Sequence, residues 1–136
     1  MRVLVSACLL GENCKYNGGN NRDEKVIAFL QDKEVIPVCP EVGLGVPRTP
    51  MEIVDGKLIN KDGVEVDSVV RGAITQIMEK LKAEPVDLAI LKSRSPTCGV
   101  KQVYDGTFSG TLIDGSGVLA QALQSAGIPT IDAEDL

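Results

Sequence analysis

Short apolar runs alternate along the chain with stretches of helical periodicity. Four of the runs are brief and continuous, which is typical of strands buried on both faces of a parallel sheet. They span about residues 2–6, 35–38, 87–92 and 128–131. Three other stretches repeat their apolar residues at the spacing of one helical face. They span about residues 22–32, 69–81 and 118–126.

Polar residues and one glycine mark the expected ends of these helices. The side chains of Ser, Asn and Asp can accept a hydrogen bond from the unpaired N–H groups at a helix N-terminus. The candidate N-caps are Asn21, Asp67 or Ser68, and Ser116. Gly127 follows the third helix, where glycine readily adopts the left-handed conformation that ends a helix.

Turn residues predict two antiparallel excursions between the helices and strands. Residues 51–66 alternate apolar and polar side chains around Asp-Gly pairs at 55–56 and 62–63. An Asp-Gly pair between alternating runs is a strong signal for a β-hairpin. Residues 100–112 contain another turn, at 104–106, and are compatible with a second short hairpin.

The order of these elements predicts the fold class. Strands that alternate with helices are typical of an α/β fold with a mainly parallel sheet. Right-handed crossover connections place the helices on both faces of such a sheet. We therefore expect residues 1–136 to form a single α/β domain, with an open, mainly parallel β-sheet flanked by helices. This is a three-layer arrangement of the Rossmann or flavodoxin-like type, with a small β-hairpin insertion.

Composition and charge narrow the classes of partner and the compartment. The net charge is −5, whereas nucleic-acid duplexes and anionic membranes attract basic patches, so we expect neither as a main partner. No stretch approaches the roughly 20 apolar residues that span a bilayer, and no secretory signal is visible. We expect a cytoplasmic protein that is a monomer or a weak homodimer. Thiols stay reduced in the cytosol.

Three of the four cysteines follow predicted strands. Cys8, Cys39 and Cys98 each come after an apolar run, in segments rich in Gly, Pro or Ser. The carboxyl ends of parallel strands share one edge of a sheet, where ligands bind. We therefore expect these three thiols to converge on one site. Cys14 has no strand before it, and its simplest interpretation is a bystander thiol.

The spacing of the cysteines does not by itself identify a metal. The sequence has no Cys-x-x-Cys pair, so it matches neither a zinc ribbon, nor a thioredoxin-type redox pair, nor a ferredoxin run. It also has no histidine, which excludes Ser-His-Asp and Cys-His catalysis and mixed Cys/His zinc sites within this chain. Cysteine is common in protein cores, so each thiol could also be structural.

Several neighbours of the cysteines have both a functional and a structural interpretation. Glu41 could be a general acid or base, or a cluster ligand, or else an exposed loop carboxylate. Ser93 and Ser95 could donate hydrogen bonds to substrate or sulfide, or stabilise a turn before a proline. Lys92 and Arg94 could neutralise a bound anion or a thiolate cluster, or extend into solvent.

Five segments together resemble one protein family, in the same order along nearly the whole chain. They span residues 5–11, 14–18, 38–41 with the Pro-Arg pair at 47–48, 90–99, and 104–106. The family consists of small bacterial and archaeal iron–sulfur proteins, formerly filed as a domain of unknown function. Its characterised members are thiouracil desulfidases.

The resemblance implies a 4Fe–4S cofactor and a reaction. The family's cluster ligands match Cys8, Cys39 and Cys98, which leaves one iron open. That iron would accept the thiocarbonyl sulfur of a small thiolated heterocycle such as 2-thiouracil, giving uracil and sulfide. The positions near the open iron match Cys14, Glu41 and Ser93, which are the implied catalytic residues.

Two other classes of function remain as alternatives. The same pocket could store or carry metal or sulfur without catalysis, and steady turnover of a thiolated base would exclude that class. The chain could instead be a small-anion or nucleotide-binding α/β domain with incidental thiols. That alternative predicts that the three strand-end cysteines lie far apart.

Overall fold

A four-stranded parallel sheet forms the centre of the computed structural model, which describes residues 1–13, 20–40 and 50–136. The order of its strands is β2-β1-β5-β8. Their bounds are Arg2–Ser6 for β1, Glu34–Val38 for β2, Leu88–Leu91 for β5 and Thr130–Asp132 for β8. In register, Ser6 pairs with Val38 and Val5 pairs with Ile90, so the carboxyl ends of the three strands lie at one edge.

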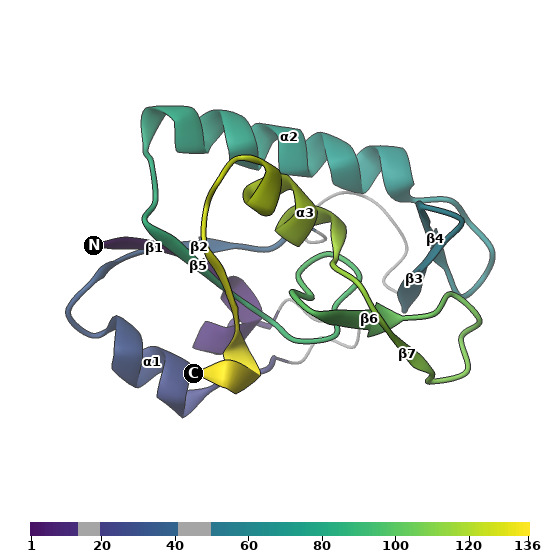
Figure 1. Cartoon of the computed structure of the whole chain (residues 1–136), viewed down its shortest axis with the longest axis horizontal. Helices are drawn as coiled ribbons and strands as arrows, with labels where there is room; N and C mark the ends of the chain where they lie inside the picture. The colour runs from purple at the N-terminus through teal and green to yellow at the C-terminus, as the bar shows by residue number, and fades with distance from the viewer. Residues whose placement is uncertain (14–19, 41–49) are drawn as a thin grey trace.

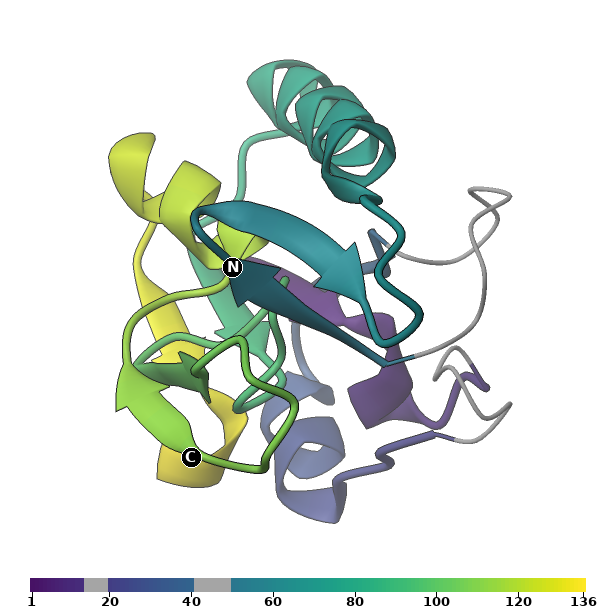
Figure 2. The same ribbon diagram turned by 90° about the vertical axis from the view of Figure 1, so that its right-hand side faces the viewer.

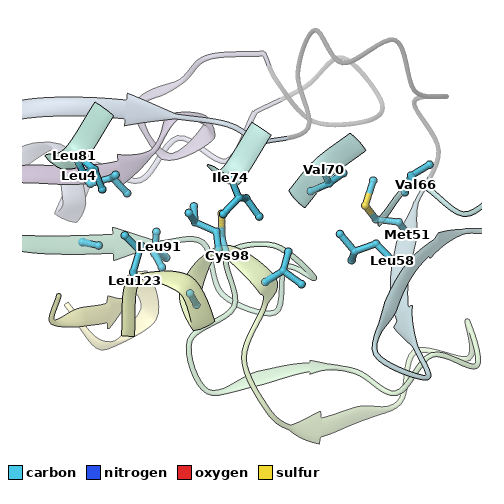
Figure 3. Packing of buried hydrophobic residues seen from close by; sticks show 14 residues of the cluster. Leu4, Met51, Leu58, Val66, Val70, Ile74, Leu81, Leu91, Cys98 and Leu123 are labelled. Carbon is cyan, nitrogen blue, oxygen red and sulfur yellow. The ribbon is translucent and has the colours of Figure 1, made fainter. Parts of the chain in front are cut away.

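Helices cover both faces of this sheet, as the element order predicts. Helix α1 (Glu24–Leu30) lies below the sheet in Figure 1, and α2 (Asp67–Ala83) and α3 (Val118–Ser125) lie above it. Alternate residues of a strand point to opposite faces. Accordingly, Val3 and Val5 pack with α1, whereas Leu4 packs in the larger core beneath α2 and α3, which Figure 3 shows. The predicted three-layer α/β fold is confirmed.

Two antiparallel hairpins lie beside each other at one end of the molecule (Figure 2). Their strands are β3 (Met51–Val54) with β4 (Lys57–Asn60), and β6 (Gln102–Tyr104) with β7 (Leu112–Asp114). Asp55 and Gly56 form the first turn with φ values of 51° and 81°. Positive φ at both turn residues matches the twist of the flanking strands, which is why Asp-Gly predicted this hairpin.

Two short 3-10 helices flank the sheet, η1 (Ala7–Leu10) after β1 and η2 (Ala133–Asp135) after β8. Strand β8 begins at Thr130 rather than at the predicted residue 128. The reason is that the N–H of Ile128 still donates to the carbonyl of Leu123 and so closes the end of α3. Gly127 has a φ of 79° there, which confirms it as a helix stop.

The predicted N-caps are wrong for the first and third helices. Asp23, not Asn21, caps α1, because its carboxylate accepts from the N–H groups of Lys25 and Val26. The hydroxyl of Ser116 points away from the N-terminus of α3 and donates to the carbonyl of Val100.

The second helix also lacks the predicted cap. Asp67 is already the first residue of α2, and no side chain caps the N-terminus of that helix. The Asp67 carboxylate instead accepts from the N–H of Leu58 at 3.0 Å and from the guanidinium of Arg71. No helix in the described part of the chain has the length and apolar character that crossing a membrane requires.

Candidate functional site

A cavity of about 590 Å³ opens at the edge where β1, β2 and β5 end. Cys8, Cys39 and Cys98 all line it, although they come from three segments that are far apart in the sequence. Ser93, which the sequence singled out, lines the same cavity. Cys14 and Glu41, the other two predicted site residues, lie outside the described residues.

Cys8 and Cys39 follow neighbouring strands that pair up to their last residues. Cys8 lies in η1, and its carbonyl accepts from the N–H groups of Gly11 at 3.2 Å and Asn21 at 3.0 Å. Cys39 comes directly after Val38, the partner of Ser6 in the sheet. Both cysteines are half-buried, so the pairing of β1 with β2 delivers two thiols to one wall of the cavity.

Cys98 is held in a tight turn that Ser95 organises. The hydroxyl oxygen of Ser95 accepts from the backbone N–H groups of Thr97 at 3.2 Å and Cys98 at 3.0 Å. The carbonyl of Ser95 accepts from the N–H of Gly99 at 2.8 Å. Cys98 is only 5% exposed and also belongs to the larger hydrophobic core (Figure 3). This turn therefore joins the cavity to the packed interior.

The N-terminus of α3 is built onto the same turn. The carbonyl of Thr97 accepts from the N–H of Leu119 at 2.8 Å, and the carbonyl of Pro96 accepts from that of Val118 at 3.0 Å. These carbonyls replace the side-chain cap that Ser116 was predicted to give. A Cβ at Gly117 would lie 2.8 Å from the backbone nitrogen of Cys98, so only glycine fits there.

Thiols of three loops suit a polynuclear cluster better than a single ion. None of Cys8, Cys39 and Cys98 is in a disulfide. Within the described residues, no three Cys, His, Asp or Glu side chains gather closely enough to hold one metal ion. Thiolates are the usual ligands of iron–sulfur clusters, in which each binds a different iron, so their sulfurs need not surround one atom. Three thiolates are therefore a donor set that fits an iron–sulfur cluster.

The charges around the cavity are mainly positive in a protein that is acidic overall. Among the described lining residues, the charged ones are Lys61, Lys92, Arg94 and Glu52. Nearby cations offset the negative charge of a thiolate cluster. This local excess of cations fits three metal-binding thiolates.

Ser93 is buried and belongs to a polar network that reaches the end of the chain. Its hydroxyl donates to a carboxylate oxygen of Glu134 at 3.1 Å and accepts from the ammonium of Lys92 at 3.1 Å. Glu134 also pairs with the guanidinium of Arg94 at 2.9 Å. No sequence pattern points to Glu134 in this role, because it lies 41 positions from Ser93 in a short acidic segment.

A second salt bridge attaches the same C-terminal turn to the loop after Cys98. The ammonium of Lys101 lies 2.9 Å from a carboxylate oxygen of Asp135. This hydrogen bond from Lys101 to Asp135 raises the pKa of the Lys101 ammonium. Arg94 and Lys101 thus bind η2 from both ends of the loop that carries Cys98.

Glu52 is another residue that sequence reasoning missed. It is 8% exposed, and one of its carboxylate oxygens accepts from the N–H groups of Gly106 at 2.9 Å and Phe108 at 3.2 Å. This contact joins the first hairpin to the loop of the second. Phe108 has a φ of 57°, which a non-glycine residue adopts only when its surroundings hold it there.

The loop that Glu52 holds supplies an aromatic wall to the cavity. Phe108 and Tyr104 both line it, together with Met51. The whole chain has only two Phe and two Tyr, and two of the three aromatic residues in the described part line this cavity. Aromatic faces are well suited to a flat ring.

Comparisons with known proteins find relatives along nearly the whole chain. The family model for 2-thiouracil desulfurase matches residues 3–135. A protein of Bacillus subtilis (strain 168), described as uncharacterized protein YbbK, is 35% identical over 146 residues, covering 98% of this chain and 97% of that protein. A solved structure of the 4Fe-4S-dependent thiouracil desulfidase TudS is similar with a TM-score of 0.90 and 28% identity, covering 99% of this chain and 92% of that one.

These matches extend over both the sheet and the loops that line the cavity. The likeness to the solved desulfidase agrees with the α/β fold described above. The resemblance that five sequence segments suggested is confirmed by a family model that begins in β1 and ends in η2. The chain belongs to the 2-thiouracil desulfurase family.

Proposed function

We propose that this chain is a 4Fe–4S-dependent desulfidase that removes the thiocarbonyl sulfur of a small thiolated heterocycle such as 2-thiouracil. The observation that carries the proposal is the convergence of three strand-end thiols on one cavity, in a member of this family. The products are uracil and sulfide. The reaction exchanges sulfur for the oxygen of water, so it needs no external oxidant or reductant.

In this proposal Cys8, Cys39 and Cys98 would hold the cluster, and one iron would have no protein ligand. When bound, the cluster supplies a Lewis acid with an open position and an affinity for soft sulfur. The absence of histidine from the chain is compatible with this chemistry, because a bound cluster would supply the Lewis acid and no imidazole would be needed.

The remaining residues bind and orient the substrate. Tyr104, Phe108 and Met51 offer flat and apolar surface to a heterocyclic ring, and they keep bulk water from that side of the cavity. Lys92 and Arg94 also line the cavity, where their side chains bring positive charge. Ser93 lies between these two cations along the chain and contacts the substrate from the buried part of the cavity.

Proton transfer is assigned to the two predicted site residues outside the described part of the chain. Glu41 acts as the general acid or base, because a carboxylate can both activate water and protonate a leaving group. Cys14 is the second candidate for proton transfer. Glu41→Gln is expected to keep the cluster and to lose most of the activity.

We also propose a cytoplasmic enzyme that acts as a monomer or a weak homodimer on a free small molecule. A reducing compartment keeps three cluster ligands as thiols. The net charge of −5 disfavours a polyanionic nucleic acid as the direct partner.

Anaerobic reconstitution followed by a turnover assay tests the proposed function. The cluster-loaded protein is incubated with 2-thiouracil, and uracil and sulfide are quantified over time. We expect both products to form in equal amounts over many turnovers. A single equivalent of sulfide per protein would support sulfur storage instead. No turnover of any base in a panel of thiolated pyrimidines, with the cluster intact, would refute the desulfidase.

A further inference from the structure

The hydroxyl of Ser93 has a hydrogen-bond pattern with a fixed direction. A serine hydroxyl offers one O–H donor and two acceptor lone pairs. Ser93 Oγ lies 3.1 Å from Lys92 Nζ and 3.1 Å from Glu134 Oε1. Among the described residues, these are the two partners of this hydroxyl.

The charges of these partners decide which group donates. An ammonium has only donors, so Lys92 occupies one lone pair of Ser93. An ionised carboxylate only accepts, so Glu134 takes the single proton of the hydroxyl. What remains for a molecule in the cavity is the second lone pair. In this arrangement Ser93 can accept a hydrogen bond from a substrate and cannot donate one.

The structure holds Glu134 firmly in this arrangement. The guanidinium of Arg94 lies 2.9 Å from one carboxylate oxygen of Glu134 and 3.0 Å from the other. The backbone N–H of Glu134 donates to the side chain of Asp132 at 2.9 Å. Arg94 has a φ of 61°, an unfavourable value for a residue with a Cβ. A residue with such a φ persists only where its surroundings hold it, and Arg94 contacts both carboxylate oxygens of Glu134 here.

We propose that Ser93 is a specificity-determining residue that accepts a hydrogen bond from a ring N–H next to the thiocarbonyl group. Glu134 and Lys92 are positioning residues that set the direction of this hydrogen bond. The enzyme thus selects heterocycles in the thione form with an N–H beside the C=S bond, over analogues that carry a substituent on that nitrogen. This inference rests on the proposed function and names the feature of the substrate that the site reads.

The proposal reverses the role that the sequence suggested for Ser93. A serine beside a metal site was expected to donate to the substrate or to sulfide. Donation toward the cavity would require the hydroxyl to leave Glu134, and the carboxylate would then lose a partner. Ser93 is 4% exposed, so its hydroxyl has little access to water, and leaving Glu134 would exchange a hydrogen bond to a charged carboxylate for a weaker one to a neutral ligand.

N-methylated substrates test this hydrogen bond directly. We compare kcat/KM for 2-thiouracil, 1-methyl-2-thiouracil and 3-methyl-2-thiouracil, using wild-type protein and Ser93→Ala. Methylation of one nitrogen should lower kcat/KM about tenfold or more in the wild type, because the site loses a hydrogen bond. Ser93→Ala should abolish that penalty for the same isomer. An equal loss of kcat/KM in wild type and Ser93→Ala would show a steric effect and overturn the proposal. Full activity of the wild type on both methylated substrates would overturn it as well.

Glu134→Gln tests whether Glu134 sets the direction of the Ser93 hydrogen bond, because this substitution can reverse the donor and acceptor without removing the partner. An amide can donate to Ser93, which frees the hydroxyl proton to turn toward the cavity, so the discrimination between the two substrates should shrink. Asp135→Asn is the matched control, because Asp135 lies in the same turn but pairs with Lys101. It should leave the discrimination unchanged. Unchanged discrimination in Glu134→Gln would refute the positioning role.

The readout is insensitive to a merely structural defect. A ratio of two kcat/KM values does not depend on how much protein is folded or carries a cluster, since both substrates report on the same active molecules. Binding of uracil and of its two N-methyl derivatives, measured by anaerobic equilibrium dialysis, gives a second readout without turnover. If no thiolated base is turned over, the proposed function fails. The affinity of uracil relative to its N-methyl derivatives, compared between wild type and Ser93→Ala, still decides the role of Ser93.

Discussion

The side chains of Ser95, Thr97 and Cys98 are linked by hydrogen bonds that end at the Cys98 sulfur. Ser95 Oγ already accepts two backbone N–H groups, so its own proton goes to the hydroxyl of Thr97 at 2.9 Å. The Thr97 hydroxyl in turn donates to Cys98 Sγ at 3.7 Å. Hydrogen bonds to cluster sulfurs stabilise the more negative, reduced state.

Thr97→Val is therefore expected to lower the reduction potential of the reconstituted cluster. A weak hydrogen bond to sulfur should be worth roughly 20–50 mV, since about 59 mV corresponds to a tenfold change in a one-electron equilibrium. Thr75→Val is the control, because Thr75 bonds only the helix backbone at an exposed site of α2. Anaerobic redox titration measures both variants, and an unchanged or raised potential in Thr97→Val contradicts the account.

Glu52 is the residue that joins the two hairpins above the cavity. Glu52→Ala leaves the N–H groups of Gly106 and Phe108 without their acceptor. We expect the free energy of unfolding to fall by about 2–3 kcal/mol and KM to rise as the aromatic wall loosens. Glu52→Gln keeps a carbonyl acceptor and should restore most of both values.

Urea unfolding and steady-state kinetics measure these effects of Glu52. Glu65→Ala is a suitable control, because Glu65 forms an exposed ion pair with Lys57 at 3.7 Å, which should contribute little. If Glu52→Ala changed stability no more than Glu65→Ala, the coupling between the hairpins would be disproved.

At the scale of elements, α3 and the turn that carries Cys98 form one unit. Gly117 allows the helix N-terminus to approach the backbone of Cys98, and the turn carbonyls accept from the first N–H groups of α3. Gly117→Ala should destabilise the protein by about 2 kcal/mol, because the helix must move away from the turn. It should also lower the affinity for the cluster.

Gly72→Ala provides the matched control for this substitution. A Cβ at Gly72 meets no other atom within 4 Å, and alanine favours a helix by about 1 kcal/mol over glycine. Gly72→Ala should therefore stabilise α2 slightly and leave iron content unchanged. Thermal unfolding and iron analysis compare the two variants. If Gly117→Ala changed neither the stability nor the iron content, α3 would not support the turn.

Elements with a strong local signal could be predicted from the sequence, and helix caps could not. The apolar runs predicted β1, β2 and β5, and the Asp-Gly pair at 55–56 predicted the first hairpin. Both signals are local, because the burial of a strand and the conformation of a turn depend on nearby residues. Ser116 and Asn21 are not caps because each has another partner. The Ser116 hydroxyl donates to the carbonyl of Val100, and the N–H of Asn21 donates to the carbonyl of Cys8. Such partners are distant in sequence and are set by the fold.

At the scale of the whole molecule, the parallel sheet brings distant residues to one edge. The convergence of Cys8, Cys39 and Cys98 could be expected, because each follows a strand and strand ends share an edge. Glu134 and Glu52 could not be expected, because they reach the site from a 3-10 turn and from a hairpin. The nature of the cofactor also could not be derived from spacing, and it follows from the family.

The iron and acid-labile sulfide content of four single variants tests the central claim most directly. Cys8→Ser, Cys39→Ser, Cys98→Ser and Cys14→Ser are reconstituted anaerobically beside the wild type. We expect about four irons per chain in the wild type and in Cys14→Ser, and a lost or unstable cluster in the other three. A full cluster in any of those three, or its loss only in Cys14→Ser, would contradict the assignment of Cys8, Cys39 and Cys98 as ligands.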